Sequence, residues 1–165
     1  MDLRRFWRHI LMSPWAARRA FPESTLDAIE REIGAQEKRH RGELRFVVEL
    51  ELSTAHLWHE VSSRDRAREV FAQTGVWNTE ENTGVLVYLL LAERRVEIVA
   101  DRGISAKVSD DEWRSICAMM ESRFGEGRHE EGAIAGIRAI SDLLATHFPA
   151  RLDNPNELPD RPLLI

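Results

Sequence analysis

Residues 85–92 read VLVYLLLA, the longest apolar run in the 165-residue chain. The run is too short for a membrane span, which needs about 18 apolar residues or more. A short run that is apolar at each position is typical of a strand that is covered on both faces. We therefore expect residues 85–91 to form the central strand of a sheet.

The segments around this run indicate how the sheet is connected. Residues 95–100 alternate between apolar and polar and follow a turn at Glu93 and Arg94, so they are expected to pair with the central strand as a hairpin. Residues 44–52 also alternate, and a helical pattern over 62–74 separates them from the central strand. That order predicts two parallel strands joined by a right-handed crossover.

Three further segments have helical periodicity: residues 24–39, 109–124 and 130–147. Ser109 and Glu112 form a capping box that predicts the start of the second. Together with the strands, these helices predict an α/β fold, a three-layer α/β/α sandwich. Its small mixed sheet has three to four strands flanked by helices. The segment 53–61, with His56 and His59, is expected to be a loop.

The composition divides the chain into three parts. Five arginines and one aspartate give residues 1–21 a charge of +4, which leaves −9 for the remainder of a chain whose net charge is −5. Residues 22–148 are expected to form one domain. Residues 149–165 hold four of the six prolines and are expected to be an extended tail. An acidic chain argues against nucleic acid as the partner, and the single Cys117 excludes an internal disulfide.

The N-terminal segment 1–21 is a basic aromatic arm or helix. On a helix, one face would carry four apolar residues: Leu3, Trp7, Ile10 and Leu11. Two readings are open: an interfacial helix at a membrane surface, or a helix packed on its own domain with its arginines in water. Because arginine and histidine interrupt the apolar residues, the segment differs from a signal peptide. We expect a cytoplasmic protein, with peripheral membrane contact on the first reading.

The hairpin also predicts a cluster of polar residues at one end of the sheet. The returning strand ends near the loop where the central strand begins, so Asp101 and Arg102 are expected beside Glu81 and Asn82, with Asp110 shortly after. Clustered oxygen donors suit Ca²⁺ or Mg²⁺, and clustered carboxylates can also raise one pKa enough for general-acid work. The alternative is that each acid is a loop or cap residue in water.

The same residues carry a family resemblance. Residues 82–87 (NTGVLV), 94–98 (RRVEI), 103–104 (GI) and 108–110 (VSD) occur in an order and spacing similar to those of the TPM domain, over about residues 22–148. The resemblance implies an α/β/α sandwich, divalent-cation binding and acid-phosphatase activity. Some family members instead assist the assembly or repair of membrane complexes.

This chain departs from the family pattern at several places, two of which lie in this cluster. Asn82 stands where the family often has an aspartate, and Asp101 and Arg102 stand where it has glycine and tyrosine. A carboxylate lost at position 82 and gained at position 101 is compatible with a preserved cation site or with a lost one.

Two functions follow from these patterns. The first is metal-assisted hydrolysis of phosphate esters. Asn82, Asp101 and Asp110 would hold the Ca²⁺ or Mg²⁺ ion and Glu81 would be a further ligand or order water, while Asp101 and Arg102 are the catalytic candidates and Arg102 meets a phosphate oxygen. The second is a non-catalytic adaptor or assembly factor that contacts a membrane-associated protein partner through residues 1–21.

Overall fold

The computed structural model describes residues 2–165 and contains, within that range, one four-stranded sheet in the order β3-β2-β1-β4. β1 (Glu43–Glu49) lies parallel to β2 (Gly84–Leu90), which pairs antiparallel with β3 (Arg95–Ala100). The short β4 (Leu163–Leu164) lies parallel to β1 on its other side. The mixed sheet, the hairpin and the parallel crossover are therefore confirmed.

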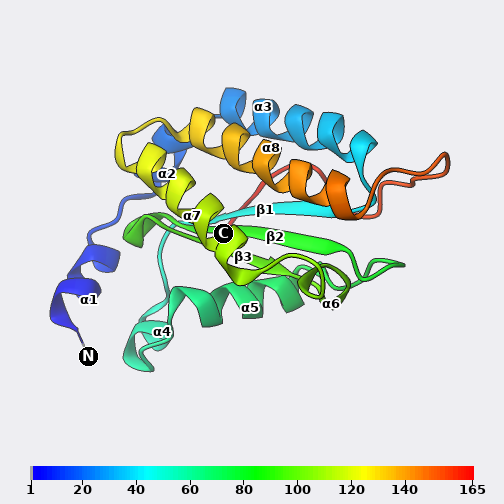
Figure 1. Ribbon diagram of the computed structural model, residues 1–165. Helices are drawn as coiled ribbons and strands as arrows, with labels where there is room; N and C mark the ends of the chain where they lie inside the picture. The colour runs from blue at the N-terminus through cyan, green and yellow to red at the C-terminus, as the bar shows by residue number, and fades with distance from the viewer. Residues whose placement is uncertain (1) are drawn as a thin grey trace.

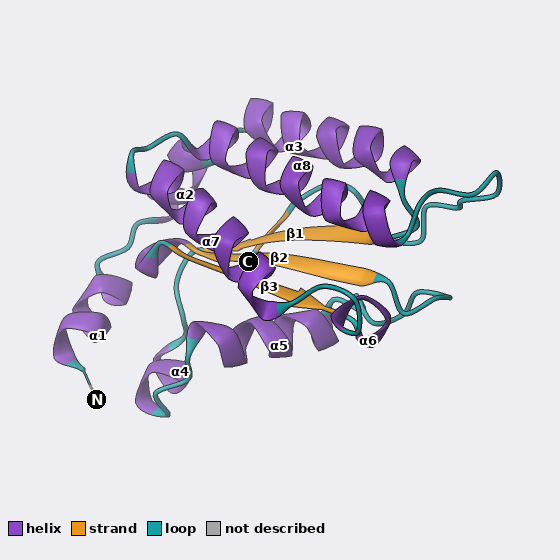
Figure 2. Ribbon diagram, viewed as in Figure 1, coloured by secondary structure: helices purple, strands orange, loops and turns teal. Residues whose placement is uncertain are grey.

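Helices cover both faces of this sheet and complete the three layers (Figures 1 and 2). α3 (Glu23–Gln36), α7 (Asp110–Gly125) and α8 (His129–His147) lie over one face, and α5 (Ser63–Gln73) lies over the other. The crossover helix between the two parallel strands is α5, which supplies the second layer from the middle of the chain. The α/β/α sandwich is thus confirmed.

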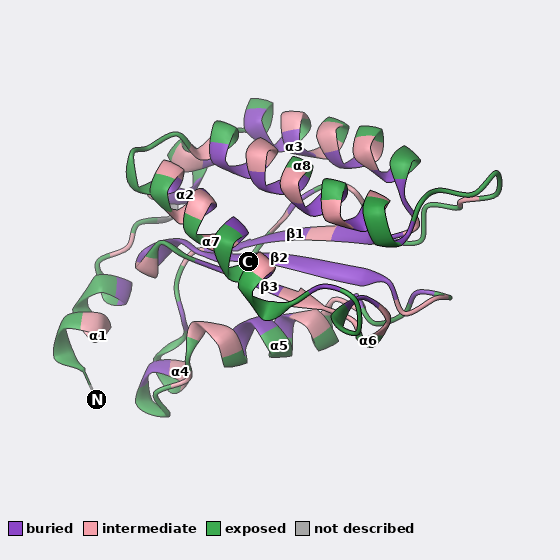
Figure 3. Cartoon of the chain, viewed as in Figure 1, coloured by how far each residue is buried: buried purple, intermediate pink, exposed green. Residues whose placement is uncertain are grey.

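The central strand explains why the core has two halves. All seven residues of β2 are buried (Figure 3). Val85, Val87 and Leu89 belong to the apolar cluster beneath α3, α7 and α8, while Leu86 and Leu90 belong to the cluster beneath α5. Successive side chains of a strand point to opposite faces, so a strand between two helical layers is apolar at each position.

Short helices occupy several connections. They are η1 (Glu37–Arg39), η2 (Leu91–Glu93), α4 (Thr54–Trp58) and α6 (Arg102–Ser105). The expectation of a loop over residues 53–61 is wrong for its first half, because the Ser53 hydroxyl accepts a hydrogen bond from the backbone N–H of His56 and caps α4. One turn with a capping serine carries too little periodicity to be recognised in the sequence.

The first 21 residues contain two helices, α1 (Leu3–Ile10) and α2 (Pro14–Ala20). α2 leads into Phe21, which is buried and lies 6.3 Å from Phe46 and 6.2 Å from Phe124 between ring centroids. The arm is therefore joined to the main core at its C-terminal end.

Residues 149–165 run along the domain surface. The side-chain amide of Asn154 donates to the carbonyl oxygens of Glu37 and His40, each at 3.1 Å. Leu158 is buried, and the segment ends in β4. The proline-rich segment is thus held against the domain by contacts that the sequence pattern does not indicate.

Candidate functional site

The sheet end at which β1 and β2 begin and β3 ends carries the residues singled out in the sequence. We call Glu81, Asn82, Asp101 and Arg102 the rim. The Asp101 N–H donates to the Gly84 carbonyl at 2.9 Å, and the Gly103 N–H donates to the Asn82 carbonyl at 3.1 Å. The placement of Asp101 and Arg102 beside Asn82, expected from the hairpin, is confirmed.

Arg102 and Asn82 are joined directly. The Nε and Nη2 atoms of Arg102 donate to Asn82 Oδ1 at 3.1 and 3.0 Å. Asp101 caps α6 by accepting from the Arg102 N–H at 2.7 Å through Oδ1. Its Oδ2 is buried and has no hydrogen-bond partner among residues 2–165. One carboxylate oxygen at the rim is thus unused.

Glu81 is neutralised by two arginines. Arg41, which precedes β1, and Arg151, from the C-terminal segment, each donate to its carboxylate, Arg151 at 2.6 Å. With Arg41 and Arg151 beside the rim, three guanidinium groups accompany its two carboxylates. Arginines from such distant parts of the chain could not be assigned to this site by a local sequence pattern.

Asp110 takes a different position. It is the first residue of α7 and lines a cavity along β3 together with Arg64, Arg95 and Arg114. Within residues 2–165, no group of three or more histidine, cysteine, aspartate or glutamate side chains is gathered so that it could hold a metal ion.

Two buried glutamates lie behind the rim. The Glu37 carboxylate accepts from the Leu44 N–H at 2.8 Å, and burial raises its pKa to about 9. The Glu43 carboxylate accepts from the N–H groups of Glu157 and Leu158, each at 3.0 Å, and burial raises its pKa as well. Both line a cavity of about 400 Å³. Because a helix-end glutamate is usually in water, no sequence pattern singled out Glu37.

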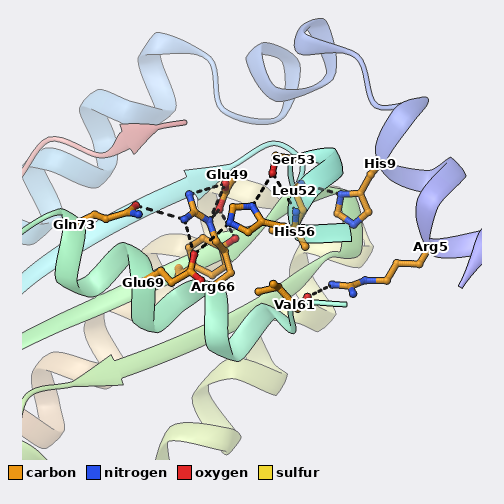
Figure 4. A network of polar contacts seen from close by, with 11 residues as sticks. Arg5, His9, Glu49, Leu52, Ser53, His56, Val61, Arg66, Glu69 and Gln73 are labelled. Atoms are coloured by element: carbon orange, nitrogen blue, oxygen red, sulfur yellow. Dashed lines mark hydrogen bonds and ion pairs between the residues drawn. The ribbon is translucent and has the colours of Figure 1, made fainter. Parts of the chain in front are cut away.

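The arm forms a second candidate site, and α1 faces the domain with Arg5, His9 and the half-buried Phe6. His9 is fully buried, and its Nδ1 accepts from the Leu52 N–H at 3.0 Å (Figure 4). Its Nε2 therefore carries the proton that is shared with Glu93 at 3.0 Å. Arg5 donates to the same Glu93 at 2.5 Å and to the Val61 carbonyl at 2.7 Å. These bonds fix the rotation of α1 about its own axis.

With that rotation, the apolar side of α1 faces outward. The exposed apolar residues of the arm are Leu3, Trp7, Ile10, Leu11 and Trp15. Four exposed arginines accompany them: Arg4, Arg8, Arg18 and Arg19. The guanidinium carbon of Arg19 lies 5.6 Å from the centroid of the Trp15 ring. We call these nine residues the arm surface. The helix packs on its own domain through Arg5, His9 and the half-buried Phe6, and the four apolar residues of the other side stay exposed.

A network of buried charges lies between β1 and α5. Arg66 donates to both carboxylate oxygens of Glu49 and to Glu69, and the Tyr88 hydroxyl donates to Glu49 at 2.6 Å (Figure 4). His56 bridges Ser53 at 3.0 Å and Glu69 at 3.4 Å, on the edge of this network. The network connects β1, β2, α4 and α5 within the domain.

The fold defines the class of protein: an α/β/α sandwich whose mixed sheet has the strand order β3-β2-β1-β4. A comparison with family models matches the TPM domain over residues 17–143, so the chain belongs to the TPM domain family. No curated protein matches the chain.

Two solved structures are similar. The BA42 protein from the psychrophilic bacterium Bizionia argentinensis is 31% identical to this chain and superposes with a TM-score of 0.76. The match covers 86% of this chain and 93% of the BA42 chain. The N-terminal domain of a protein from P. gingivalis is 25% identical, with 72% of each chain covered and a TM-score of 0.56. In residues 2–165, no helix has the length and apolar character needed to cross a membrane.

Proposed function

We propose that this TPM domain attaches to an anionic membrane surface through the arm surface and serves there as a non-catalytic adaptor for a membrane-associated protein. The observation that carries the proposal is the outward apolar side of α1, where Leu3, Trp7, Ile10 and Leu11 are exposed. A helix packed on its own domain normally turns such a side inward. Contiguous exposed apolar side chains mark interaction surfaces.

The residue types on this surface favour a lipid interface. Tryptophan places an apolar ring and a polar N–H at headgroup level, which is where it is enriched in membrane proteins. Each arginine near an anionic leaflet contributes about 1 kcal/mol of attraction, and the arm surface has four in a chain of net charge −5. Full burial of a large apolar side chain adds about 1.5–3 kcal/mol.

Vesicle co-sedimentation tests this function with a matched pair of variants. Trp7 and Trp77 are both 55% exposed, and Trp77 follows α5 at the other end of the sheet. Wild type and Trp77→Ala are expected to sediment with phosphatidylcholine vesicles that contain phosphatidylglycerol, and Trp7→Ala is expected to sediment less. Added salt should weaken binding because it screens the arginines. Equal sedimentation of the two variants would contradict the proposal. Failure of the wild type to sediment with anionic vesicles would contradict it too.

We propose as a second candidate that the rim binds Ca²⁺ or Mg²⁺ and hydrolyses phosphate esters weakly. The observation in its favour is the buried Asp101 Oδ2, which has no partner among residues 2–165 and belongs to the residue beside Arg102 and Asn82. An anionic oxygen is the ligand that these cations prefer. Asn82 and Glu81 would complete the ligands, with Asp110 as a more distant one, and Arg102 would turn toward a phosphate oxygen.

An NMR titration with each cation tests this candidate. Amide shifts at residues 80–84 and 101–105 are expected, and Asp101→Asn should abolish them. Asp111→Asn is the control, because Asp111 is an exposed residue of α7 that is paired with Arg114 at 2.5 Å. Hydrolysis of p-nitrophenyl phosphate should likewise disappear in Asp101→Ala. Amide shifts that persist in Asp101→Asn would rule out Asp101 as a ligand of the cation.

A further inference from the structure

A further exposed aromatic side chain lies close to the arm. Trp58, the last residue of α4, is 72% exposed, which is the highest value among the five tryptophans of the chain. Its neighbour Leu57 is buried in the apolar cluster beneath α5. The function proposed for the arm surface gives Trp58 no role, so its exposure needs a separate explanation.

The local backbone holds Trp58 in this exposed position. The Glu60 N–H donates to the Leu57 carbonyl at 3.2 Å, which closes the end of α4. The Val61 N–H donates to the His56 carbonyl at 2.9 Å and closes the following turn. Because adjacent residues of a helix point about 100° apart, the inward packing of Leu57 directs Trp58 toward solvent. Its exposure is thus a property of an ordered turn.

α1 and α4 are neighbours at one end of the sheet. Arg5 of α1 donates to the Val61 carbonyl at 2.7 Å, and Phe6 and Leu57 line the same cavity of about 220 Å³. Both helices lie where β1 and β2 end, at the opposite end of the sheet from the rim (Figure 1). Trp58 and the exposed apolar side of α1 therefore belong to one end of the domain.

The chemistry of α4 favours the headgroup region of a membrane as its occupant. Tryptophan is enriched at that level of the bilayer. α4 contains no lysine or arginine, and Glu51 and Glu60 flank it in the sequence, so the turn supplies no positive charge of its own. Its contribution is apolar, whereas the arginines of the arm surface supply the attraction to anionic lipid. Interfacial helices combine the same two terms.

We propose that Trp58 makes a second contact with the membrane, so that α1 and α4 both face the lipid and the rim faces the aqueous phase. The inference rests on the proposed function of the arm surface and adds the orientation of the domain to it. A single helix leaves the domain free to rotate about the helix axis, and a contact on a second element restricts that rotation. The seven residues of β2 span about 20 Å, so the rim is kept at that distance from α4, where a partner protein has access to it.

Fluorine NMR of the full chain labelled with fluorotryptophan tests this orientation, because each tryptophan gives its own resonance. The probe is a bicelle of phosphatidylcholine and phosphatidylglycerol, prepared with and without a spin label on the lipid headgroup. The spin label is expected to broaden the resonances of Trp7 and Trp58 and to leave that of Trp77 sharp. Trp77 is the matched control, since it is 55% exposed and lies at the rim end of the sheet.

Vesicle co-sedimentation supplies a second measurement. Trp58→Ala is expected to bind phosphatidylglycerol-containing vesicles about fivefold more weakly than wild type, because an apolar ring no longer enters the lipid. Trp77→Ala is expected to bind as wild type does. The second contact is overturned, and the arm function stands, if Trp7 broadens while Trp58 stays sharp or if Trp58→Ala keeps wild-type binding. If neither resonance broadens, the arm function and this inference are both overturned.

Discussion

Replacing Arg66 tests whether the buried network holds α5 on the sheet. Arg66 is 8% exposed and Glu49 is 6% exposed, and they are joined by bonds of 2.9 to 3.1 Å. Arg66→Met keeps the aliphatic stem but leaves the Glu49 carboxylate buried, with only the Tyr88 hydroxyl as a donor from this network. An unpaired buried charge costs about 3–5 kcal/mol.

Urea unfolding followed by circular dichroism measures the loss. With a slope of about 2 kcal/mol per molar urea, a loss of 3 kcal/mol or more moves the midpoint down by roughly 1.5 M. The matched control is Arg68→Met on the same helix, because Arg68 and Asp65 form an ion pair with side chains that are 63% and 61% exposed. Such a pair contributes about 0–1 kcal/mol.

The double variant Glu49→Gln, Arg66→Met separates the pair from the individual charges. Because it removes both charges, it is expected to recover part of the free energy of unfolding that Arg66→Met loses. The reasoning is refuted if Arg66→Met loses no more stability than Arg68→Met. It is also refuted if the double variant loses the sum of its two single losses.

Three other outcomes are expected. The pKa of Glu37 is raised by burial from 4.5 to about 9, so the folded state binds this proton more tightly than the unfolded state does. The contribution of Glu37 to the free energy of unfolding is therefore full below the unfolded pKa and is lost as the pH rises toward 9. Glu37→Gln should therefore flatten the pH dependence of the urea midpoint between about pH 5 and 9, and an unchanged slope would exclude Glu37 as its source. Gly103→Ala should lose about 1–3 kcal/mol, because the new Cβ would lie 2.6 Å from the Asn82 carbonyl oxygen. Gly125→Ala, where a Cβ meets nothing within 4 Å, should not be destabilised, and a similar loss in both variants would show that the close approach is not the cause. Glu93→Gln should loosen α1 and speed tryptic cleavage after Arg4 and Arg8, since Glu93 accepts from both Arg5 and His9; cleavage no faster than in Glu126→Gln would contradict that anchor.

The rim illustrates how far connectivity alone reaches. Asp101 and Asn82 are 19 positions apart, but a hairpin with a short turn returns the chain to its starting point, so their proximity follows from the sequence. Their partners do not follow from it. Arg41 and Arg151 neutralise Glu81 from positions that are far apart in the sequence, and no local pattern connects those three residues.

The burial of titratable side chains could not be predicted from the sequence either. Glu37 and Arg66 occur in segments whose other polar residues are in water, and their burial results from packing against β1 and the C-terminal segment. The two-residue β4 gave no periodic signal, because two residues cannot show an alternation.

What the sequence by itself determined is the set of elements with strong periodicity. The apolar run at residues 85–91 required a covered central strand, and its neighbours required a hairpin and a parallel crossover. Tertiary structure alone decided which side of α1 faces outward. The apolar stripe was visible in the sequence, but its rotation depends on Glu93 and Leu52, which lie more than 40 positions from His9. Periodicity identifies the faces of a helix, whereas contacts between distant residues decide which face the domain covers.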